Sequence, residues 1–291
     1  IMACCGPNRQ IPRNDRVTYW GEGCARPRTV RWSRPMEHNG GSIIAEVLAR
    51  RGVRFLFALC GGHISPILVG AKERGLRVID VRDEASAVFA ADATARMSGI
   101  PGVAAVTAGP GVTNSVTAVK NAQMAQSPLV LFGGAAATVL RGRGSLQDID
   151  QLSIMKSCTK WATTVSTIAN LAPTVERAFE VAQDGVPGPV FVEVPIDLLY
   201  PETIVKDWYL KESGVQKSDT LVAKALELYL RGHLYRQFHA PRTRFSLSMP
   251  EVKWPGKDDA RAQIDAATQM LRGAARPVLV VGNQSTVRGQ D

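Results

Sequence analysis

Short apolar runs rich in β-branched residues alternate with helical segments over residues 40–194, and this alternation limits the possible folds more than any other feature. Such a pattern is typical of βαβ units, in which helices cover both faces of a parallel sheet. The sequence therefore predicts an α/β domain of three layers. The expected strands are 54–59, 77–81, 103–107, 129–132 and 189–194, and the expected helices are 43–51, 65–74, 84–97, 111–125 and 168–183.

The net charge of +9 is unevenly spread along the 291 residues. Residues 1–35 carry seven Arg against two acidic residues, whereas residues 36–200 carry fourteen basic and fourteen acidic residues. Because the excess charge lies outside the patterned region, it argues against a folded surface that binds nucleic acid. The longest apolar run, 129–140, has glycines at 133 and 134 and is shorter than the ~18–20 residues of a membrane helix. We therefore expect neither a nucleic-acid partner nor a membrane segment in this chain.

Residues 1–38 contain scattered Pro, Gly and Arg without an apolar period, and they lack the apolar core of a secretory signal. We expect an irregular basic tail that is either a disordered extension or absent from the mature protein. The five cysteines, at 4, 5, 24, 60 and 158, have no metal-binding spacing. Cys60 and Cys158 lie in apolar stretches and are expected to be buried thiols.

Three loops with unusual chemistry follow the first three expected strands: GGHISP at 61–66, RDE at 82–84 and GPGVTN at 109–114. Ligands of parallel sheets bind where the carboxyl ends of the strands meet, so these loops are expected to be neighbours. Each also has a purely structural interpretation. Gly-Pro-Gly can expose backbone amides to a ligand or make a tight turn. Glu84 can simply stabilise the N-terminus of a helix through the helix dipole, and His63 can be a hydrogen-bonded structural residue.

Five segments carry a resemblance to a known family: VRDE at 81–84, AADATARMSG at 90–99, TAGPGVTN at 107–114, NAQMAQSP at 121–128 and GPVFVEVPID at 188–197. In this order they resemble the pyrimidine-binding domain of thiamine-diphosphate enzymes. The group of acetolactate synthases, oxalyl-CoA decarboxylases and 2-hydroxyacyl-CoA lyases is the most similar. The resemblance covers residues 40–200 almost continuously.

The resemblance implies a role for each loop. Glu84 would be the catalytic glutamate, which hydrogen-bonds a ring nitrogen of the cofactor's aminopyrimidine and drives it toward the imino tautomer. The cofactor-binding residues would be Glu84, Gly109, Pro110, Gly111 and Asn114. The loop on the substrate side would contain Gly61, Gly62, His63 and Ile64, together with Gln147.

The implied activity is cleavage of a 2-hydroxyacyl-CoA to an aldehyde and formyl-CoA, and condensation of 2-ketoacids in the manner of acetolactate synthase is the alternative. Leu146 stands where acetolactate synthases usually have Phe, which favours the lyase. An alternative of another class is a non-catalytic module for oligomerisation or regulation. The retained Glu84 and residues 109–114 argue against it.

The family's GDG motif, which holds Mg²⁺ and the cofactor's diphosphate, does not occur in this sequence. We therefore expect the N-terminal half of an enzyme, without metal ligands of its own, which is inactive alone and forms a homodimer or tetramer. The chain has no GxGxxG motif, so its sequence offers no independent nucleotide site. Whether FAD binds therefore stays open. An animal member of the group is anchored in the endoplasmic reticulum, and the resemblance alone implies that location for this protein. Without the resemblance, the expected location is the cytoplasm.

Four regions are expected along the chain. Residues 1–38 would be the tail, 39–200 the pyrimidine-binding domain and 201–258 a connector with one helix over 221–230. From 259 the pattern resumes with a helix and the apolar run RPVLVVG at 276–282, which resembles the start of the family's middle domain. The fold is thus expected to be a three-layer α/β domain plus the start of a second α/β domain.

Overall fold

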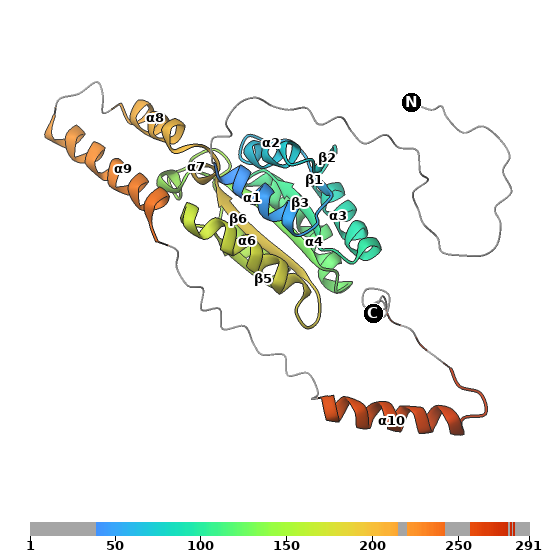
Figure 1. The fold of residues 1–291 in the computed structure, drawn as a ribbon. Coiled ribbons are helices and arrows are strands. Elements are labelled where there is room, and N and C mark those ends of the chain that lie inside the picture. Colours follow the sequence, from blue (N-terminus) through green and yellow to red (C-terminus); the bar gives the residue numbers. More distant parts are fainter. Residues whose placement is uncertain (1–38, 215–219, 242–256, 279, 281, 283–291) are drawn as a thin grey trace, which may run out of the picture. The chain divides into compact units, whose positions relative to one another are not determined.

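The computed structural model describes residues 39–214, 220–241, 257–278, 280 and 282 (Figure 1). A six-stranded parallel sheet has the order β2-β1-β3-β4-β6-β5. Its strands are β1 (Phe55–Ala58), β2 (Arg77–Asp80), β3 (Gly102–Val106), β4 (Leu129–Ala135), β5 (Trp161–Thr164) and β6 (Pro189–Pro195). The helices of this domain are α1 (Gly40–Arg50), α2 (Ser65–Glu73), α3 (Glu84–Ser98), α4 (Pro110–Met124), the 3₁₀ turn η1 (Thr138–Leu140), α5 (Gln151–Lys156), α6 (Ile168–Gln183) and α7 (Ile196–Leu199).

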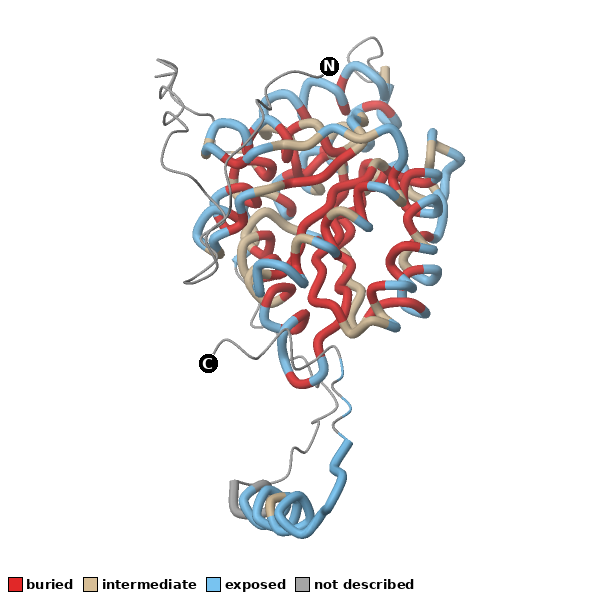
Figure 2. The backbone as a smooth tube through the Cα atoms, turned by 90° about the vertical axis from the view of Figure 1, so that its right-hand side faces the viewer, coloured by how far each residue is buried: buried red, intermediate tan, exposed pale blue. Residues whose placement is uncertain are grey.

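The central strands are buried on both faces, as the burial view shows (Figure 2). Val103 and Ala105 of β3 belong to a core shared with α1, α2 and α6, while Ala104 and Val106 belong to a core shared with α3, α4 and α5. Successive side chains of a strand point to opposite faces, so an uninterrupted apolar run fills both cores. The three-layer α/β prediction is confirmed.

Local signals set the helix ends. Asp83 caps α3 by accepting a hydrogen bond from the Ser86 amide at 2.9 Å, and α3 ends at Gly99 with a positive φ of 73°. Asn39 and Ser42 form a reciprocal capping box at the start of α1. These caps place Glu84 in the first turn of its helix.

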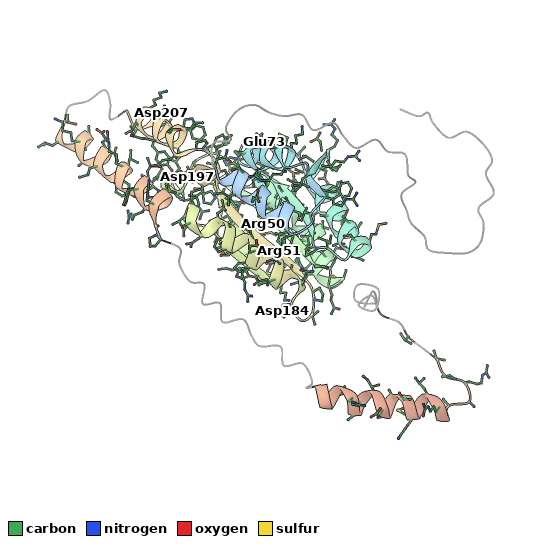
Figure 3. The ribbon with its side chains drawn as sticks, viewed as in Figure 1. Arg50, Arg51, Glu73, Asp184, Asp197 and Asp207 are labelled. Atoms are coloured by element: carbon green, nitrogen blue, oxygen red, sulfur yellow. The ribbon has the colours of Figure 1, made fainter. Side chains whose placement is uncertain are left out.

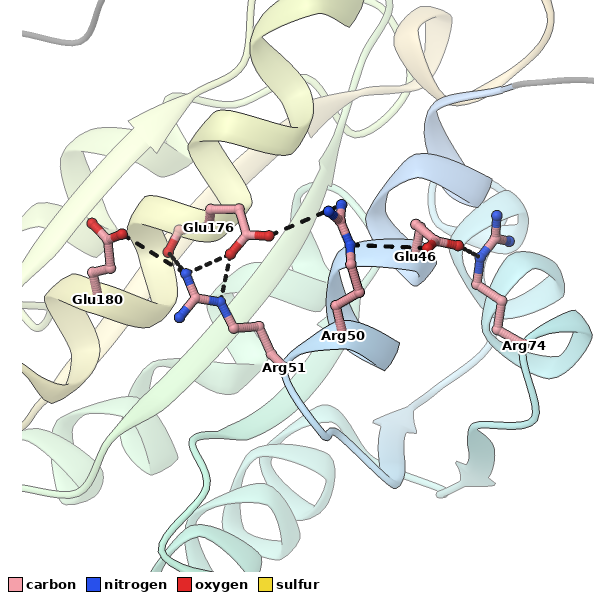
Figure 4. Close-up of polar contacts among 6 residues, drawn as sticks. All are labelled: Glu46, Arg50, Arg51, Arg74, Glu176 and Glu180. Carbon is pink, nitrogen blue, oxygen red and sulfur yellow. Dashed lines mark hydrogen bonds and ion pairs between the residues drawn. The ribbon is translucent and has the colours of Figure 1, made fainter.

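Ion pairs link α1 to its neighbours α2 and α6 on the outside of the domain (Figure 4). Arg51 donates from Nε to Glu176 at 2.5 Å, and Arg74 donates from Nε to Glu46 at 2.8 Å. The hydrogen bond from Arg74 lowers the pKa of the Glu46 carboxyl. The side chains of Arg51 and Glu176 are half-buried, and Glu46 is exposed. Ion pairs that solvent reaches contribute about 1 kcal/mol or less each, so these links orient the helices more than they stabilise the fold.

Several elements lie where the sequence pattern predicts none. The sequence pattern did not predict the edge strand β5 or the short helix α5. It also did not predict helix α8 (Glu202–Glu212), which lies in the expected connector. The predicted helix over 221–230 is longer, as α9 (Leu221–His239). The prediction of two buried thiols is half wrong: Cys158 is buried, but Cys60 is exposed because it lies in the loop after β1.

The helix expected at the start of the second domain is present as α10 (Lys257–Gly273). The described positions among 276–282 are not in a strand, and residues 279 and 281 lie outside the described part, so a second domain stays a prediction. The tail 1–38 also lies outside it. None of the described helices is both long and apolar enough to cross a membrane.

Candidate active site

The three predicted loops lie at neighbouring positions on one edge of the sheet, because β1 pairs with both β2 and β3. Ala58, the last residue of β1, lies opposite Asp80 of β2 and Ala105 of β3. All three strands run parallel, so their carboxyl ends share one edge. The predicted juxtaposition of these strand ends is confirmed.

Glu84 begins α3 and is 7% exposed. Asn114, in the first turns of α4, donates from Nδ2 to Oε2 of Glu84 at 3.2 Å. The described residues form no hydrogen bond with the other oxygen, Oε1. The carboxylate is therefore held by one oxygen and retains its second oxygen for another partner.

Two glycines are required beside this carboxylate. A Cβ on Gly111 would lie 2.8 Å from Cγ2 of Thr107 and 3.4 Å from Oε1 of Glu84. Gly109 has φ of 63°, and a Cβ there would lie 2.8 Å from the carbonyl oxygen of Gln147. The loop therefore packs tightly where any larger residue would displace its neighbours.

Gln151, which no sequence pattern indicated, joins this loop to the sheet. It is buried, accepts from the Gly109 amide at 2.9 Å and donates to the Gly134 carbonyl at 2.7 Å. Nothing in the local sequence separates this glutamine from its neighbours, because its partners lie 42 and 17 residues away. A buried polar side chain with both ends bonded holds the backbone at Gly109 in place.

His63 lies against Thr107, the residue whose Cγ2 packs against Gly111. Its Nδ1 lies 3.4 Å from Oγ1 of Thr107, and a Cβ on Gly61 would lie 2.6 Å from Cβ of the same threonine. Burial lowers the pKa of the His63 imidazole below its usual 6.5. The ring is thus neutral at pH 7 and can both donate and accept a hydrogen bond.

A cavity of about 310 Å³ lies beyond the ends of β4 and β6. It is lined by Gln147, Gln151 and Arg141, and by Glu193, a buried residue of β6. Arg141 is bonded to Glu193, which also accepts from Oγ1 of Thr164 at 2.5 Å. The guanidinium offsets the charge of Glu193, but Asp148 and Asp150 also line the cavity, so its lining has more carboxylates than cations.

The predicted site residues fall into two groups. Gly109, Gly111, Asn114 and Glu84 lie together, and Gln147 and Gly61 join them through the packing described above. The others make fewer contacts at the site: Pro110 is exposed, a Cβ on Gly62 would meet none of the described residues within 4 Å, and Ile64 is fully buried in the core.

Comparison with known proteins agrees with this geometry. Residues 38–154 match the family described as thiamine pyrophosphate enzyme, N-terminal TPP binding domain. The chain is 49% identical over 254 residues to 2-hydroxyacyl-CoA lyase 2 of Danio rerio, covering 87% of this chain and 40% of the relative. The identity with 2-hydroxyacyl-CoA lyase 2 of Xenopus laevis is 50% over 261 residues, covering 86% and 39%.

A more distant relative is an acetolactate synthase large subunit of Mycobacterium tuberculosis, 40% identical over 159 residues, which cover 55% of this chain and 29% of the relative. The chain spans about two-fifths of the length of the lyases that it matches. The matched residues 38–154 include Glu84 and the Gly109–Asn114 loop, which the parallel sheet holds together. Residues 38–154 therefore form the N-terminal TPP binding domain of the thiamine pyrophosphate enzymes, within a chain that is similar to these lyases along most of its length.

Proposed function

We propose that the protein containing this chain is a thiamine-diphosphate-dependent lyase, which cleaves a 2-hydroxyacyl-CoA into an aldehyde and formyl-CoA. The bond between the carbonyl carbon and the hydroxyl-bearing carbon breaks, and the atoms of the two products equal those of the substrate. The observation that carries the proposal is the buried Glu84 carboxylate, held through Oε2 by Asn114 with Oε1 unbonded by the described residues.

The residues around Glu84 fit the aminopyrimidine of the cofactor. A flat ring needs close access to the backbone, and a glycine at 111 places no side chain against Oε1 of Glu84, from which a Cβ would lie 3.4 Å. When bound, thiamine diphosphate would supply a nucleophilic carbon for addition to the carbonyl group and would accept the electron pair of the carbon–carbon bond that breaks. Glu84 would hold the exchangeable proton at Oε1, opposite a ring nitrogen.

Asn114 and Gln151 would orient these groups without exchanging protons themselves. Asn114 occupies Oε2 of Glu84, so that only Oε1 faces the ring. Gln151 holds the Gly109 backbone, which has a positive φ, in place. Such preorganisation reduces the reorganisation that the reaction requires.

The substrate side would be formed by His63 and by the cavity under Gln147. A neutral imidazole can hydrogen-bond the 2-hydroxyl group without adding charge to the site. A lining with three carboxylates and one arginine suits the neutral amides of an acyl-CoA arm better than its anionic phosphates. This assignment of the cavity is part of the proposal.

The test uses a chimera in which the remaining part of the zebrafish relative follows residue 291. Purified chimera, with thiamine diphosphate and Mg²⁺, is offered a 2-hydroxyacyl-CoA, and formyl-CoA is measured by mass spectrometry. We expect formyl-CoA release that is abolished in Glu84→Gln and retained in Glu73→Gln, which changes an exposed glutamate at the end of α2, labelled in Figure 3. Equal activity of Glu84→Gln and the unchanged chimera would contradict the role of Glu84.

The second candidate is condensation of 2-ketoacids, favoured by the acetolactate synthase relative. Leu146 is 81% exposed, so it does not occupy the cavity in the way expected of a substrate-shaping aromatic residue. Acetolactate formed from pyruvate, without cleavage of the acyl-CoA, would favour this candidate. A folded chimera inactive on both substrates would favour the non-catalytic module.

The remaining features of the whole protein are proposals of the same kind. Mg²⁺ would be bound by the part of the protein that corresponds to the rest of the relatives, and FAD binding stays open. A dimer or tetramer would complete the site between subunits. The location at the endoplasmic reticulum is proposed from the resemblance alone.

A further inference from the structure

Asp197 lies at the centre of a buried polar network outside the site described above (Figure 3). It follows β6 in α7, and its Oδ2 atom accepts four hydrogen bonds. The donors are the amide of Thr138 at 3.1 Å, Oγ1 of Thr138 at 2.6 Å, the hydroxyl of Tyr209 at 2.6 Å and Nε2 of Gln237 at 2.8 Å. They come from η1, α8 and α9.

The proton positions in this network follow from counting donors. The Thr138 hydroxyl has a single proton, which it gives to Asp197. Its oxygen therefore accepts from Nε2 of Gln237 at 2.8 Å and from Nε2 of His233 at 2.7 Å. Two side chains of α9 thus bond Thr138 directly, and one of them also bonds Asp197.

The network contains a buried carboxylate without a hydrogen-bonded cation among the described residues. Neutral hydrogen-bond donors alone stabilise this carboxylate, so each of these hydrogen bonds contributes more to stability than it would at the surface. Oδ1 of Asp197 and Oε1 of Gln237 are buried and have no partner within the described part of the chain.

Thr138 begins the segment that carries the substrate-side residues. Residues 138–150 run from η1 to α5 and include Arg141, which is bonded to Glu193, and Gln147, which packs against Gly109. Glu193 and Asp197 are four residues apart at the end of β6. The segment is therefore attached to the end of β6 at two points, and one of these also binds the connector.

We propose that Asp197 is a positioning residue, through which the connector helices α8 and α9 hold the segment 138–150 over the cavity. Movement of the connector would then change the position of Gln147, although neither helix is bonded to it. The structural coupling stands independently of the reaction, and only its effect on substrate binding rests on the proposed function.

Hydrogen exchange on the 291-residue chain tests the coupling. Tyr209→Phe removes one donor on α8 and leaves the segment 138–150 unaltered. We expect the hydrogen-bonded amides of Leu140, Gly142 and Asp148 to exchange at least about fivefold faster. Tyr235→Phe makes the same chemical change at an exposed position of α9 and should leave these amides unchanged.

Faster exchange confined to α8 and α9 would overturn the proposal, because the network would then serve only to pack the helices. Amides of β3 report global unfolding, which must be unchanged for the comparison to count. If Tyr209→Phe unfolds the chain, His233→Phe on α9 replaces it, because it removes a contact with Thr138 and leaves the segment 138–150 unaltered. We again expect faster exchange of the Leu140, Gly142 and Asp148 amides, and faster exchange confined to α8 and α9 would overturn the proposal.

The chimera tests the consequence for catalysis. We expect Tyr209→Phe to raise KM for the 2-hydroxyacyl-CoA severalfold, while the thiamine diphosphate concentration that gives half-maximal activity stays the same. An inactive parent chimera would reject the proposed function and leave the exchange result to decide the coupling. Unaltered KM together with faster exchange would reject the positioning role for this reaction.

Discussion

The amide of Asn114 and the carboxylate of Glu84 are joined across two helices, with Nδ2 donating to Oε2 at 3.2 Å. The residues are 30 positions apart in the sequence and lie at the starts of α4 and α3. This contact occupies Oε2 of Glu84 and leaves Oε1 without a hydrogen bond from the described residues. The orientation of Glu84 therefore depends on how α3 and α4 pack.

Replacing Asn114 by alanine should lower catalysis more than stability. A hydrogen bond to a charged group contributes about 1.5–3 kcal/mol, so kcat/KM of the chimera is expected to fall roughly 10- to 100-fold. Asn114 is exposed apart from this contact, so the melting temperature should change little. Thr117→Ala, at an exposed position of the same helix, is the control. Equal loss in both variants would contradict the prediction.

Gly111→Ala should destabilise the domain, although alanine is the better helix former. The new Cβ would lie 2.8 Å from Cγ2 of Thr107, and overpacking of this kind costs about 1–3 kcal/mol. The Cβ of Gly62→Ala would meet no atom of the described residues within 4 Å, so that variant should be almost neutral. Urea unfolding of the 291-residue chain measures both variants, and a stable Gly111→Ala would show that the loop yields easily.

Asp92 should be among the stabilising residues of the α3–α4 pair. It is buried, accepts two hydrogen bonds from Arg96 at 2.8 and 2.6 Å, and accepts one from Asn121 of α4 at 3.3 Å. The bond to Asp92 also raises the pKa of Arg96. Asp92→Asn is expected to lower the free energy of unfolding by about 2 kcal/mol.

The matched control for Asp92 is an exposed carboxylate with an arginine partner. Asp80 and Arg82 form such a pair at 3.4 Å, and both side chains are largely exposed. Asp80→Asn should change the free energy of unfolding by less than about 1 kcal/mol, because solvent screens the pair. A larger loss for Asp80→Asn than for Asp92→Asn would show that burial does not decide the effect.

His63 should give the stability of the domain a dependence on pH. Burial lowers its pKa in the folded state below 6.5, so the unfolded chain binds a proton more readily. The free energy of unfolding should therefore decrease as the pH falls below about 6.5, with this part of the slope absent in His63→Gln. Nuclear magnetic resonance should give a midpoint below 6.5 for the ring, and a midpoint above that value would contradict the buried environment.

The sequence predicted the strands and helices whose patterns repeat within a few residues. The apolar runs of β1, β3 and β6 are buried on both faces, and their alternation with helices was sufficient to predict the layers. The strand β5, with the sequence WATT, is short, half-buried and at the sheet edge, so it has no continuous apolar signal. Its pairing with β6 makes it a strand.

The candidate site was predictable to the extent that its residues carry local signals. Glu84 stands after a strand and next to a cap, and Gly109 and Gly111 stand at a turn, so each is conspicuous in the sequence. Gln151 and Thr107 have no such signal, and their importance depends on partners that the fold brings near. Cys60 shows the converse error, because an apolar stretch did not ensure burial once the strand had ended.

The sequence alone determined the class of fold, the five strongly apolar strands with the helices between them, and the resemblance to a family, because periodicity, caps and motifs are properties of residues close together in the chain. The tertiary structure decided which oxygen of Glu84 is held, and that Thr138 and Gln237 meet at Asp197 across 59 and 40 residues. Such contacts depend on the packing of whole helices against the sheet. Their energy is gained only after the chain has folded, so no local pattern records them.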